Sequence, residues 1–409
     1  MRAEEVKELG KLGAGAFAGP ATLARDVHRA AAGRVFGALG LLGAPARVMH
    51  DGISRAAYWS VGSGLRAPLA AGAGALARAT RGAMPMADSR GGGLALAALN
   101  GAIGDTLEPE LALELSIRRR GRAVDTDPAG LAEAFPDATP KLALFVHGLC
   151  ESEDAWRLRR PTYGSRLRDE LDYTPVYVRY NSGLRVSDNG RRLAEVLEQL
   201  VSGWPCEVDE IALVGHSMGG LLARSACHYG EAAGHEWTAR LRHVFCLGTP
   251  HMGAPLERAA NVAGWTLGRL VETRPFADLV NGRSAGIKDL RYGNCVEKDW
   301  CDCDPDEFLN DRCCEVPFLP NATYYFVGAT LARDTDSRLG RLVGDLLVQL
   351  PSASGEGPRR RIPFEIDNGL RLGGLTHFDL LSHPAVYDQM RAWLDREPVP
   401  AGGGRSPVV

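Results

Sequence analysis

The stretch Ile211-Ala-Leu-Val-Gly-His-Ser-Met-Gly-Gly-Leu-Leu-Ala-Arg224 decides the fold of this 409-residue chain. Its first four residues are apolar, and good helix formers follow the glycine pair. Between them Gly215-His-Ser-Met-Gly219 fits the pattern G-x-S-x-G, whose glycines let the backbone turn sharply around the serine. The stretch therefore predicts a strand, a strained turn and a helix, with the hydroxyl of Ser217 exposed at the carboxyl end of the strand. The alternative is a glycine-rich connection with an idle serine.

Short apolar runs before and after this stretch alternate with segments of helical period. We expect strands at 142–146, 175–180, 211–214, 244–247 and 324–327. Because strands separated by helix-length segments form βαβ units, the pattern predicts an α/β fold with a mostly parallel sheet covered on both faces. A further half-buried strand is expected where apolar and other residues alternate, at Leu111, Leu113, Leu115 and Ile117.

A serine hydroxyl becomes a nucleophile when a base takes its proton, so we searched for a histidine after the turn. His377 stands in a glycine-flanked loop before the apolar stretch 386–394. A late loop at the carboxyl edge of the sheet is where the base must lie, and His377 is the predicted base. The rival is His383, which precedes Pro384 and is expected to cap the following helix.

The base in turn needs an orienting carboxylate. Asp345 stands among Gly344 and bulky apolar residues, which predicts a partly buried carboxylate that suits this part. Asp334 and Asp336 are the rivals, because they lie closer to the end of the strand at 324–327.

An acyl-transfer site also needs hydrogen-bond donors for the developing oxyanion. The predicted strand at 142–146 runs directly into His147-Gly148-Leu149. Gly148 lets the backbone turn so that the N–H groups of Leu149 and Met218 can point to one place, which makes them the predicted oxyanion hole. The predicted substrate-binding residues are His147, Gly148, His216 and Trp265.

Three motifs occur in a recognisable order: Val146-His-Gly-Leu149, Val214-Gly-His-Ser-Met-Gly-Gly220 and Leu247-Gly-Thr-Pro-His-Met-Gly253. On these motifs, residues from about 140 to 395 resemble bacterial lipases and esterases of the α/β-hydrolase superfamily, including PGAP1-like relatives. The resemblance implies an α/β-hydrolase fold and a catalytic triad that cleaves carboxylic, lipid or acyl, esters through an acyl-enzyme without a cofactor. In such lipases a Gly-Asp-x-x-Val run carries the acid, which supports Asp345, although Leu346 stands where glycine is commoner.

Two other functions stay open on the same residues. One is an acyltransferase that uses the same triad, and the other is a non-catalytic protein that binds a membrane surface. The second would use residues 11–100, where ten Arg or Lys stand against three Asp. Basic helices of this kind can lie on anionic membranes, and the same region can equally form a helical layer on the main domain.

The chain divides into three predicted regions. Residues 1–105 form an Ala-, Gly- and Arg-rich helical region, 106–395 the α/β-hydrolase domain, and 396–409 a flexible tail. Within the second region, 254–318 is too long for a simple loop and is expected to be a cap or lid. In the first region a helix face is predicted from residues four positions apart, at Met49, Ile53, Ala57, Val61 and Leu65.

Charge and cysteine content set the expected surroundings of the protein. A net charge of −3 argues against nucleic acid as a partner, and no run approaches the ~20 apolar residues of a membrane span. The acidic start does not read as a signal peptide, and an odd number of cysteines favours the cytoplasm, with membrane association as a second expectation.

Five of the nine cysteines crowd together and leave secretion open, because they could form disulfides. Zinc would require C-x₂-C spacings that are absent here, and free thiols are the third alternative. The five are Cys295, Cys301, Cys303, Cys313 and Cys314.

Overall fold

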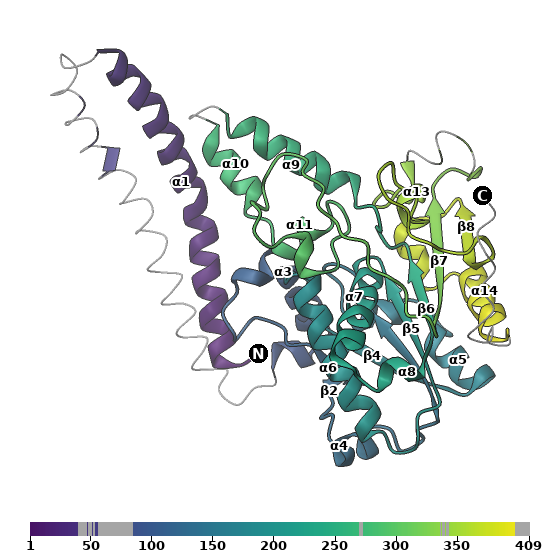
Figure 1. Cartoon of the computed structure of the whole chain (residues 1–409). Helices are drawn as coiled ribbons and strands as arrows, with labels where there is room; N and C mark the ends of the chain where they lie inside the picture. The colour runs from purple at the N-terminus through teal and green to yellow at the C-terminus, as the bar shows by residue number, and fades with distance from the viewer. Residues whose placement is uncertain are drawn as a thin grey trace.

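A computed structural model of the chain describes residues 1–39, 47, 51, 54–55, 85–269, 273–335, 337, 340 and 343–396. Its centre is an eight-stranded sheet with the strand order β2-β1-β4-β3-β5-β6-β7-β8 (Figure 1). Six neighbouring strands in this order, β4, β3, β5, β6, β7 and β8, run parallel to one another. Strand β1 pairs antiparallel with both β2 and β4. The predicted α/β fold with a mostly parallel sheet is therefore confirmed.

All five strands expected in the core of the sheet are present, each somewhat longer than its apolar run. The strands are β1 (Ser116–Arg119), β2 (Arg122–Ala123), β3 (Lys141–Val146), β4 (Tyr173–Arg179), β5 (Glu210–His216), β6 (Leu241–Leu247), β7 (Thr323–Thr330) and β8 (Gly369–Gly373). The α-helices are α1 (Ala3–Leu39), α3 (Arg90–Ile103), α4 (Pro128–Ala134), α5 (Tyr163–Leu171), α6 (Val186–Gly203), α7 (Met218–Ala233), α8 (Trp237–Arg240), α9 (Pro255–Leu267), α10 (Arg274–Asn281), α11 (Ala285–Asp289), α13 (Leu350–Ala353) and α14 (Pro384–Leu394). The 3₁₀ turns are η2 (Met86–Asp88), η3 (Gly104–Thr106), η4 (Glu153–Arg157), η5 (Glu297–Asp299), η6 (Ile366–Asn368) and η7 (His377–Leu381).

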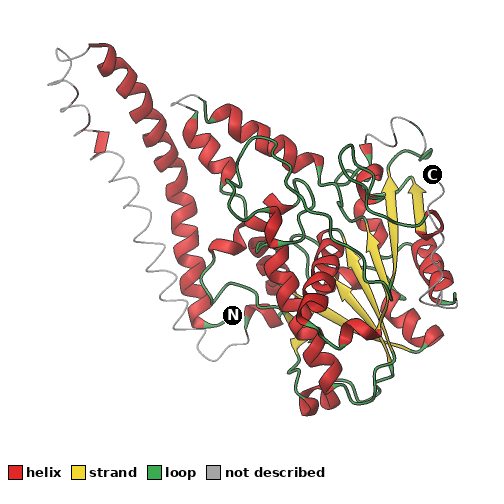
Figure 2. Ribbon diagram, viewed as in Figure 1, coloured by secondary structure: helices red, strands yellow, loops and turns green. Residues whose placement is uncertain are grey.

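Helices cover both faces of the sheet (Figure 2). Because side chains alternate along a strand, Leu142 and Leu144 of β3 pack with α6 and α7, whereas Ala143 and Phe145 pack with α5 and α14. Strands buried on both faces are continuous apolar runs, which is why the sequence marks β3, β5, β6 and β7 so clearly.

The strand expected over 111–117 is mostly absent, because β1 begins only at Ser116. Leu111 and Leu113 are nevertheless buried. The side chain of Asn100 in α3 takes the place of a neighbouring strand: its Nδ2 donates to the carbonyl of Leu111 at 2.8 Å, and its Oδ1 accepts from the N–H of Leu113 at 2.8 Å. The alternation therefore reports burial correctly, but a side chain rather than a ladder satisfies this backbone.

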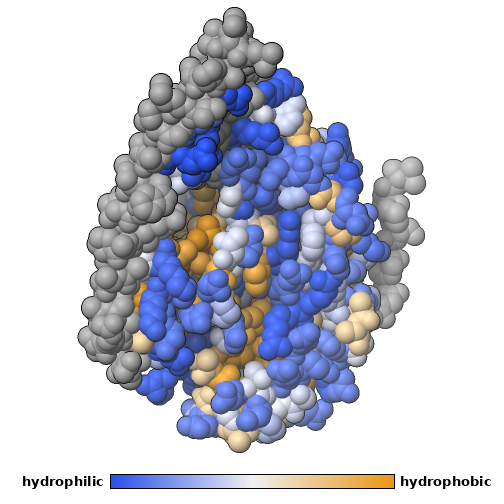
Figure 3. All heavy atoms as spheres, turned by 90° about the vertical axis from the view of Figure 1, so that its left-hand side faces the viewer, coloured by the Kyte–Doolittle hydropathy of each residue, from blue (hydrophilic) through white to orange (hydrophobic). Residues whose placement is uncertain are grey.

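The N-terminal helix α1 is fastened to the main body by its first turns. The carboxylate of Glu5 accepts from the N–H of Met86 at 2.9 Å, and Leu9 and Leu12 pack against a buried cluster that includes Leu96. Figure 3 looks onto this side of the molecule, where hydrophilic residues dominate and apolar residues gather in a band. No helix in the described ranges has the length and apolar content to cross a bilayer. The helix face predicted from Met49 to Leu65 lies outside the described residues.

The region 254–318 begins with helices, as expected. Helices α9 and α10 lie side by side between α1 and the sheet, and α11 follows them (Figure 1). After α11 the chain continues as a long loop, which contains the short turn η5, and then enters β7. This arrangement places a helical insertion between β6 and β7, next to the carboxyl ends of the parallel strands.

Candidate active site

Ser217 lies in a strained turn between β5 and α7. Its φ of +53° and ψ of −122° form a backbone conformation that residues with a side chain rarely adopt. The turn depends on its flanking glycines, since a Cβ at Gly215 would lie 2.5 Å from the carbonyl carbon of Gly219, and one at Gly219 would lie 2.3 Å from the oxygen of Val146. The N–H of Ser217 donates to the carbonyl of Leu247 at 2.7 Å, which ties the turn to the end of β6.

The predicted base and acid are in direct contact. Nδ1 of His377 lies 2.7 Å from Oδ2 of Asp345, and both side chains are almost completely buried. The N–H of His377 also donates to the backbone carbonyl of Asp345 at 3.2 Å. The other ring nitrogen, Nε2 of His377, is buried and has no hydrogen-bond partner among the described residues. A carboxylate on Nδ1 and a free Nε2 are what a general base requires.

The turn at Asp345 accounts for the Gly-Asp-x-x-Val pattern of residues 344–348. Oδ1 of Asp345 accepts from the N–H groups of Leu347 at 3.0 Å and Val348 at 2.8 Å. This turn requires positive φ at Gly344 (+58°) and at Leu346 (+88°). The carboxylate is therefore fixed by the backbone on one side and faces the imidazole on the other.

His377 lies beside the turn of Ser217. Its ring centroid is 4.7 Å from that of His216, the residue before the serine. A Cβ added to Gly248 would come within 2.9 Å of Cε1 of His377, and Gly248 directly follows Leu247, whose carbonyl holds the N–H of Ser217. The structure thus brings the three residues of the predicted triad to one edge of the sheet.

The rival residues lie elsewhere or have other partners. Nδ1 of His383 accepts from the N–H of Ala385 at 3.3 Å, so His383 caps α14 as expected. Asp334 lies in the loop after β7, and Asp336 lies outside the described residues.

The loop after β3 lies against the serine. A Cβ added to Gly148 would lie 3.0 Å from Cβ of Ser217, so a larger residue at this position would press on the serine. The N–H groups of Leu149 and Met218 donate no hydrogen bond to any described residue. The loop is braced by Ser182, whose hydroxyl accepts from the N–H of Cys150 at 3.1 Å.

The other predicted binding residues are placed differently from one another. His147 is fully buried: its Nε2 accepts from the N–H of Tyr180 at 3.3 Å and its Nδ1 lies 2.9 Å from the carbonyl of Gly148. Burial lowers the pKa of His147, and the structure places it behind the loop as a support. Trp265 on α9 is 37% exposed and stacks on Phe308 with ring centroids 4.2 Å apart. Its ring contacts therefore lie within the insertion and not at Ser217.

One residue beside this site, Glu151, was not predicted from the sequence. Its Oε2 accepts from the N–H of Gly148 at 2.7 Å and lies 3.1 Å from Nδ1 of the fully buried His216. Burial alone would raise the pKa of Glu151, but the charge and hydrogen bond of His216 together with the Gly148 N–H lower it to about 2. The available signal was an acidic residue three positions after Gly148 together with a histidine before the serine.

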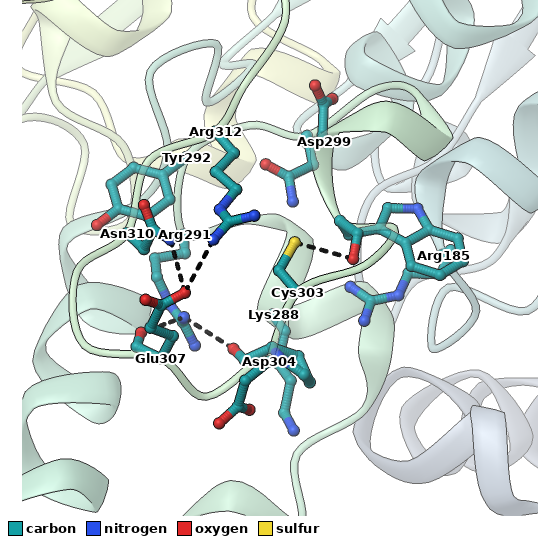
Figure 4. A pocket seen from close by; sticks show the side chains of 13 residues that line it. Arg185, Lys288, Arg291, Tyr292, Asp299, Cys303, Asp304, Glu307, Asn310 and Arg312 are labelled. Atoms are coloured by element: carbon teal, nitrogen blue, oxygen red, sulfur yellow. Dashed lines mark hydrogen bonds and ion pairs between the residues drawn. The ribbon is translucent and has the colours of Figure 1, made fainter.

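The cysteine-rich loop surrounds a separate small pocket of about 40 Å³ (Figure 4). None of the predicted catalytic residues lines it. Its charged side chains are largely paired, for instance Arg291 with Glu257 at 3.1 Å and Lys288 with Asp306 at 2.9 Å. The thiol of Cys303 points to the carbonyl of Trp300 at 3.1 Å. All nine cysteines of the chain are free thiols in the structure. No group of three or more metal-ligating side chains occurs in the described part of the chain.

Residues 162–289 match the PGAP1-like alpha/beta domain. Solved structures similar to the chain include a Bacillus licheniformis lipase, BlEst2, in its mature form, at 22% identity and a TM-score of 0.42, covering 62% of this chain and 91% of that chain. Lipase 1 from Pelosinus fermentans is 14% identical with a TM-score of 0.38, covering 64% of this chain and all of that chain (100%). Phospholipase PlaB from Legionella pneumophila is 15% identical with a TM-score of 0.37, covering 62% of this chain and 59% of that chain. No curated protein sequence matches the chain.

The parallel sheet and the turn at Ser217 define the class as α/β-hydrolase fold. Within that class, residues 162–289 are similar to the PGAP1-like alpha/beta domain.

Proposed function

We propose that this protein is a serine hydrolase that cleaves carboxylic esters, with lipid or acyl esters as the substrate class. The observation that carries the proposal is the 2.7 Å contact between His377 and Asp345, which leaves the buried Nε2 of His377 free beside the turn of Ser217. A non-catalytic serine in a glycine-rich turn does not require an imidazole oriented by a carboxylate beside it, so this contact favours a catalytic serine.

The proposed cycle begins with the attack of Oγ of Ser217 on the ester carbonyl carbon while its proton passes to Nε2 of His377. Asp345 stabilises the imidazolium, and the N–H groups of Leu149 and Met218 donate to the oxyanion. When the tetrahedral intermediate collapses, the leaving alcohol takes the proton from His377 and the acyl group stays on Ser217. Water then attacks the acyl carbon and gives its proton to Nε2 of His377. When this second tetrahedral intermediate collapses, His377 returns the proton to Oγ of Ser217 and the carboxylic acid leaves.

Apolar side chains around this point support an acyl substrate. Phe378, which follows His377, is 52% exposed, and Leu346, which follows Asp345, is 64% exposed. Exposed apolar residues on two adjacent loops can receive a hydrocarbon chain. We propose in addition that the helical insertion with Trp265 covers the bound acyl chain, and that the basic N-terminal region contacts a lipid surface.

The test compares Ser217→Ala with the unchanged protein on nitrophenyl esters of increasing acyl length. We expect turnover by the unchanged protein and a loss of at least ~10³-fold in Ser217→Ala, because the nucleophile is gone. Ser202→Ala, on the exposed surface of α6, is the matched control and should keep full activity. A fluorophosphonate probe should label Ser217, as mapped by mass spectrometry. Equal rates for Ser217→Ala and the unchanged protein contradict the proposal.

A further inference from the structure

Three loops of the site meet at one buried ion pair. The carboxylate of Glu151 accepts from the N–H of Gly148 in the loop after β3, at 2.7 Å, and from Nδ1 of His216 at the end of β5, at 3.1 Å. On the opposite side of its ring, Nε2 of His216 lies 3.2 Å from the backbone carbonyl of His377. One continuous chain of contacts thus joins the predicted oxyanion loop, the nucleophile turn and the loop of the base.

The partners of His216 define its protonation state. A carboxylate and a carbonyl oxygen can only accept, so both ring nitrogens must carry a proton when both hydrogen bonds are made. His216 is therefore an imidazolium, and its charge is buried, because the side chain is 0% exposed while that of Glu151 is 11% exposed. Removing either charge would leave the other buried without a partner, which is costly in a protein interior.

The surrounding charges agree with this state. Burial by itself would lower the pKa of His216, but the charge and hydrogen bond of Glu151, the carbonyl of His377 and the more distant Asp345 raise it. On the other side of the pair, His147 and the Gly148 N–H favour the charged form of Glu151.

We propose that Glu151 and His216 are positioning residues, an ion pair that fixes the oxyanion loop and the loop of His377 relative to Ser217. The inference rests on the function proposed above. Because the Gly148 N–H is held by Glu151, the peptide that follows has a fixed orientation, and the N–H of Leu149 stays available for the oxyanion. Because His216 holds the carbonyl of His377, the imidazole stays over the nucleophile turn.

Two consequences distinguish positioning from a general contribution to folding. Loss of the pair weakens contacts that are made to the transition state, so kcat falls while KM changes little. Deprotonation of His216 forces it to give up one of its two hydrogen bonds, so activity falls again at alkaline pH, above the raised pKa of His216.

The experiment first establishes that the unchanged protein hydrolyses nitrophenyl butyrate and that the fluorophosphonate labels Ser217. It then compares Glu151→Gln, Glu151→Asp, His216→Gln and the double variant Glu151→Gln/His216→Gln. The matched control is Glu210→Gln. Glu210 forms a similar pair with His243, at 3.3 Å, but this pair lies near the amino ends of β5 and β6, at the edge of the sheet opposite to the site. Rates are measured from pH 5 to 10 at a temperature at which every variant is folded.

We expect Glu151→Gln to lower kcat by about 10- to 100-fold, in the range of a misplaced catalytic group, with KM within about threefold. Glu151→Asp should recover part of the loss, since it restores the charge. The double variant should be no worse than the poorer single variant, because the two residues act as a unit. The alkaline limb should disappear in His216→Gln, and Glu210→Gln should match the unchanged protein.

The inference is overturned if Glu151→Gln keeps the kcat and the pH profile of the unchanged protein, or if the two single losses multiply in the double variant. Should Glu151→Gln fail to fold, the decision rests on Glu151→Asp and His216→Gln: full activity and an intact alkaline limb in both overturn the inference. Absence of both turnover and labelling in the unchanged protein instead overturns the hydrolase function itself and the positioning role with it.

Discussion

At Leu346 a bulky side chain stands in a backbone conformation that suits glycine. Its φ is +88°, and it lies between Asp345 and the two N–H groups that bind the Asp345 carboxylate. The strain of such a residue is of the order of 1–3 kcal/mol, and the turn keeps it because the carboxylate must face His377.

Leu346→Gly should raise the free energy of unfolding by up to about 1 kcal/mol, since relief of strain exceeds the added freedom of the unfolded chain. Little packing is lost, because the side chain is 64% exposed. Urea denaturation measures the change. Leu347→Gly, at a neighbouring residue without positive φ, is the control and should lower stability. A decrease in Leu346→Gly as large as in the control would contradict the interpretation.

Asp345→Asn should lower kcat by about 10³- to 10⁴-fold, because the amide no longer stabilises the imidazolium and favours the wrong ring tautomer. The fold should persist, since Oδ1 of an asparagine can still accept from Leu347 and Val348. Asp334→Asn, the replacement at the rival residue, should retain activity. If the two variants exchange these results, the acid of the triad is Asp334.

At the scale of elements, α3 acts as a substitute strand partner through Asn100. This side chain is 0% exposed and makes hydrogen bonds to Leu96, Leu111 and Leu113. Asn100→Ala should lower the free energy of unfolding by about 3 kcal/mol, because it leaves a buried N–H and a buried carbonyl without partners. Asn310→Ala, which removes one exposed contact to Glu307, should cost almost nothing. Equal midpoints in urea for both variants would show that 111–113 needs no such support.

The strands that the sequence predicts are those buried on both faces. The continuous apolar run from Leu142 to Val146 predicts a buried strand. Strand β8 lies at the edge of the sheet and alternates Leu370 and Leu372 with arginine and glycine, and it was not predicted. The alternation at 111–117 predicted burial, but it could not reveal Asn100, because a side chain eleven or more positions away supplies the hydrogen bonds.

The site residues divide in the same way. Ser217 and Asp345 stand in local patterns imposed by turns with positive φ, and such patterns are visible in a sequence. Glu151 contacts His216 from a position 65 residues earlier, and no spacing rule predicts that distance. Trp265 was assigned to the substrate from its place in an apolar, helically spaced part of the insertion, whereas its stacking on Phe308 depends on the path of the loop after α11.

At the scale of the whole molecule, the Glu151–His216 pair makes stability depend on pH. The pKa of Glu151 is about 2 in the folded protein against 4.5 in its ordinary state. A carboxyl with a lowered folded pKa stabilises fully above the ordinary value and loses this contribution as pH falls towards the folded value. We therefore expect the pair to contribute on the order of 3 kcal/mol that is lost between pH 4.5 and pH 2. The pKa of His216 is raised in the folded protein, so its contribution to stability has the opposite pH dependence. That contribution is fully present below pH 6.5 and is lost as the pH rises through the folded pKa.

The measurement is the difference in urea-unfolding free energy between the unchanged protein and Glu151→Gln as a function of pH. The difference should shrink as the solution is acidified through this window. A difference that stays constant from pH 6 to pH 2.5 would show that folding does not shift the pKa of Glu151.

The parts of the proposed site are far apart in the order of synthesis. His216 contacts His377 across 161 positions of sequence, and the imidazole comes just before α14. While the polypeptide is still being translated, the serine turn can already have folded against β5, but no proton acceptor exists for it. In the proposed mechanism a nascent chain is therefore inert towards the esters around it, and hydrolytic activity begins only after His377 has been synthesised and has folded onto the sheet.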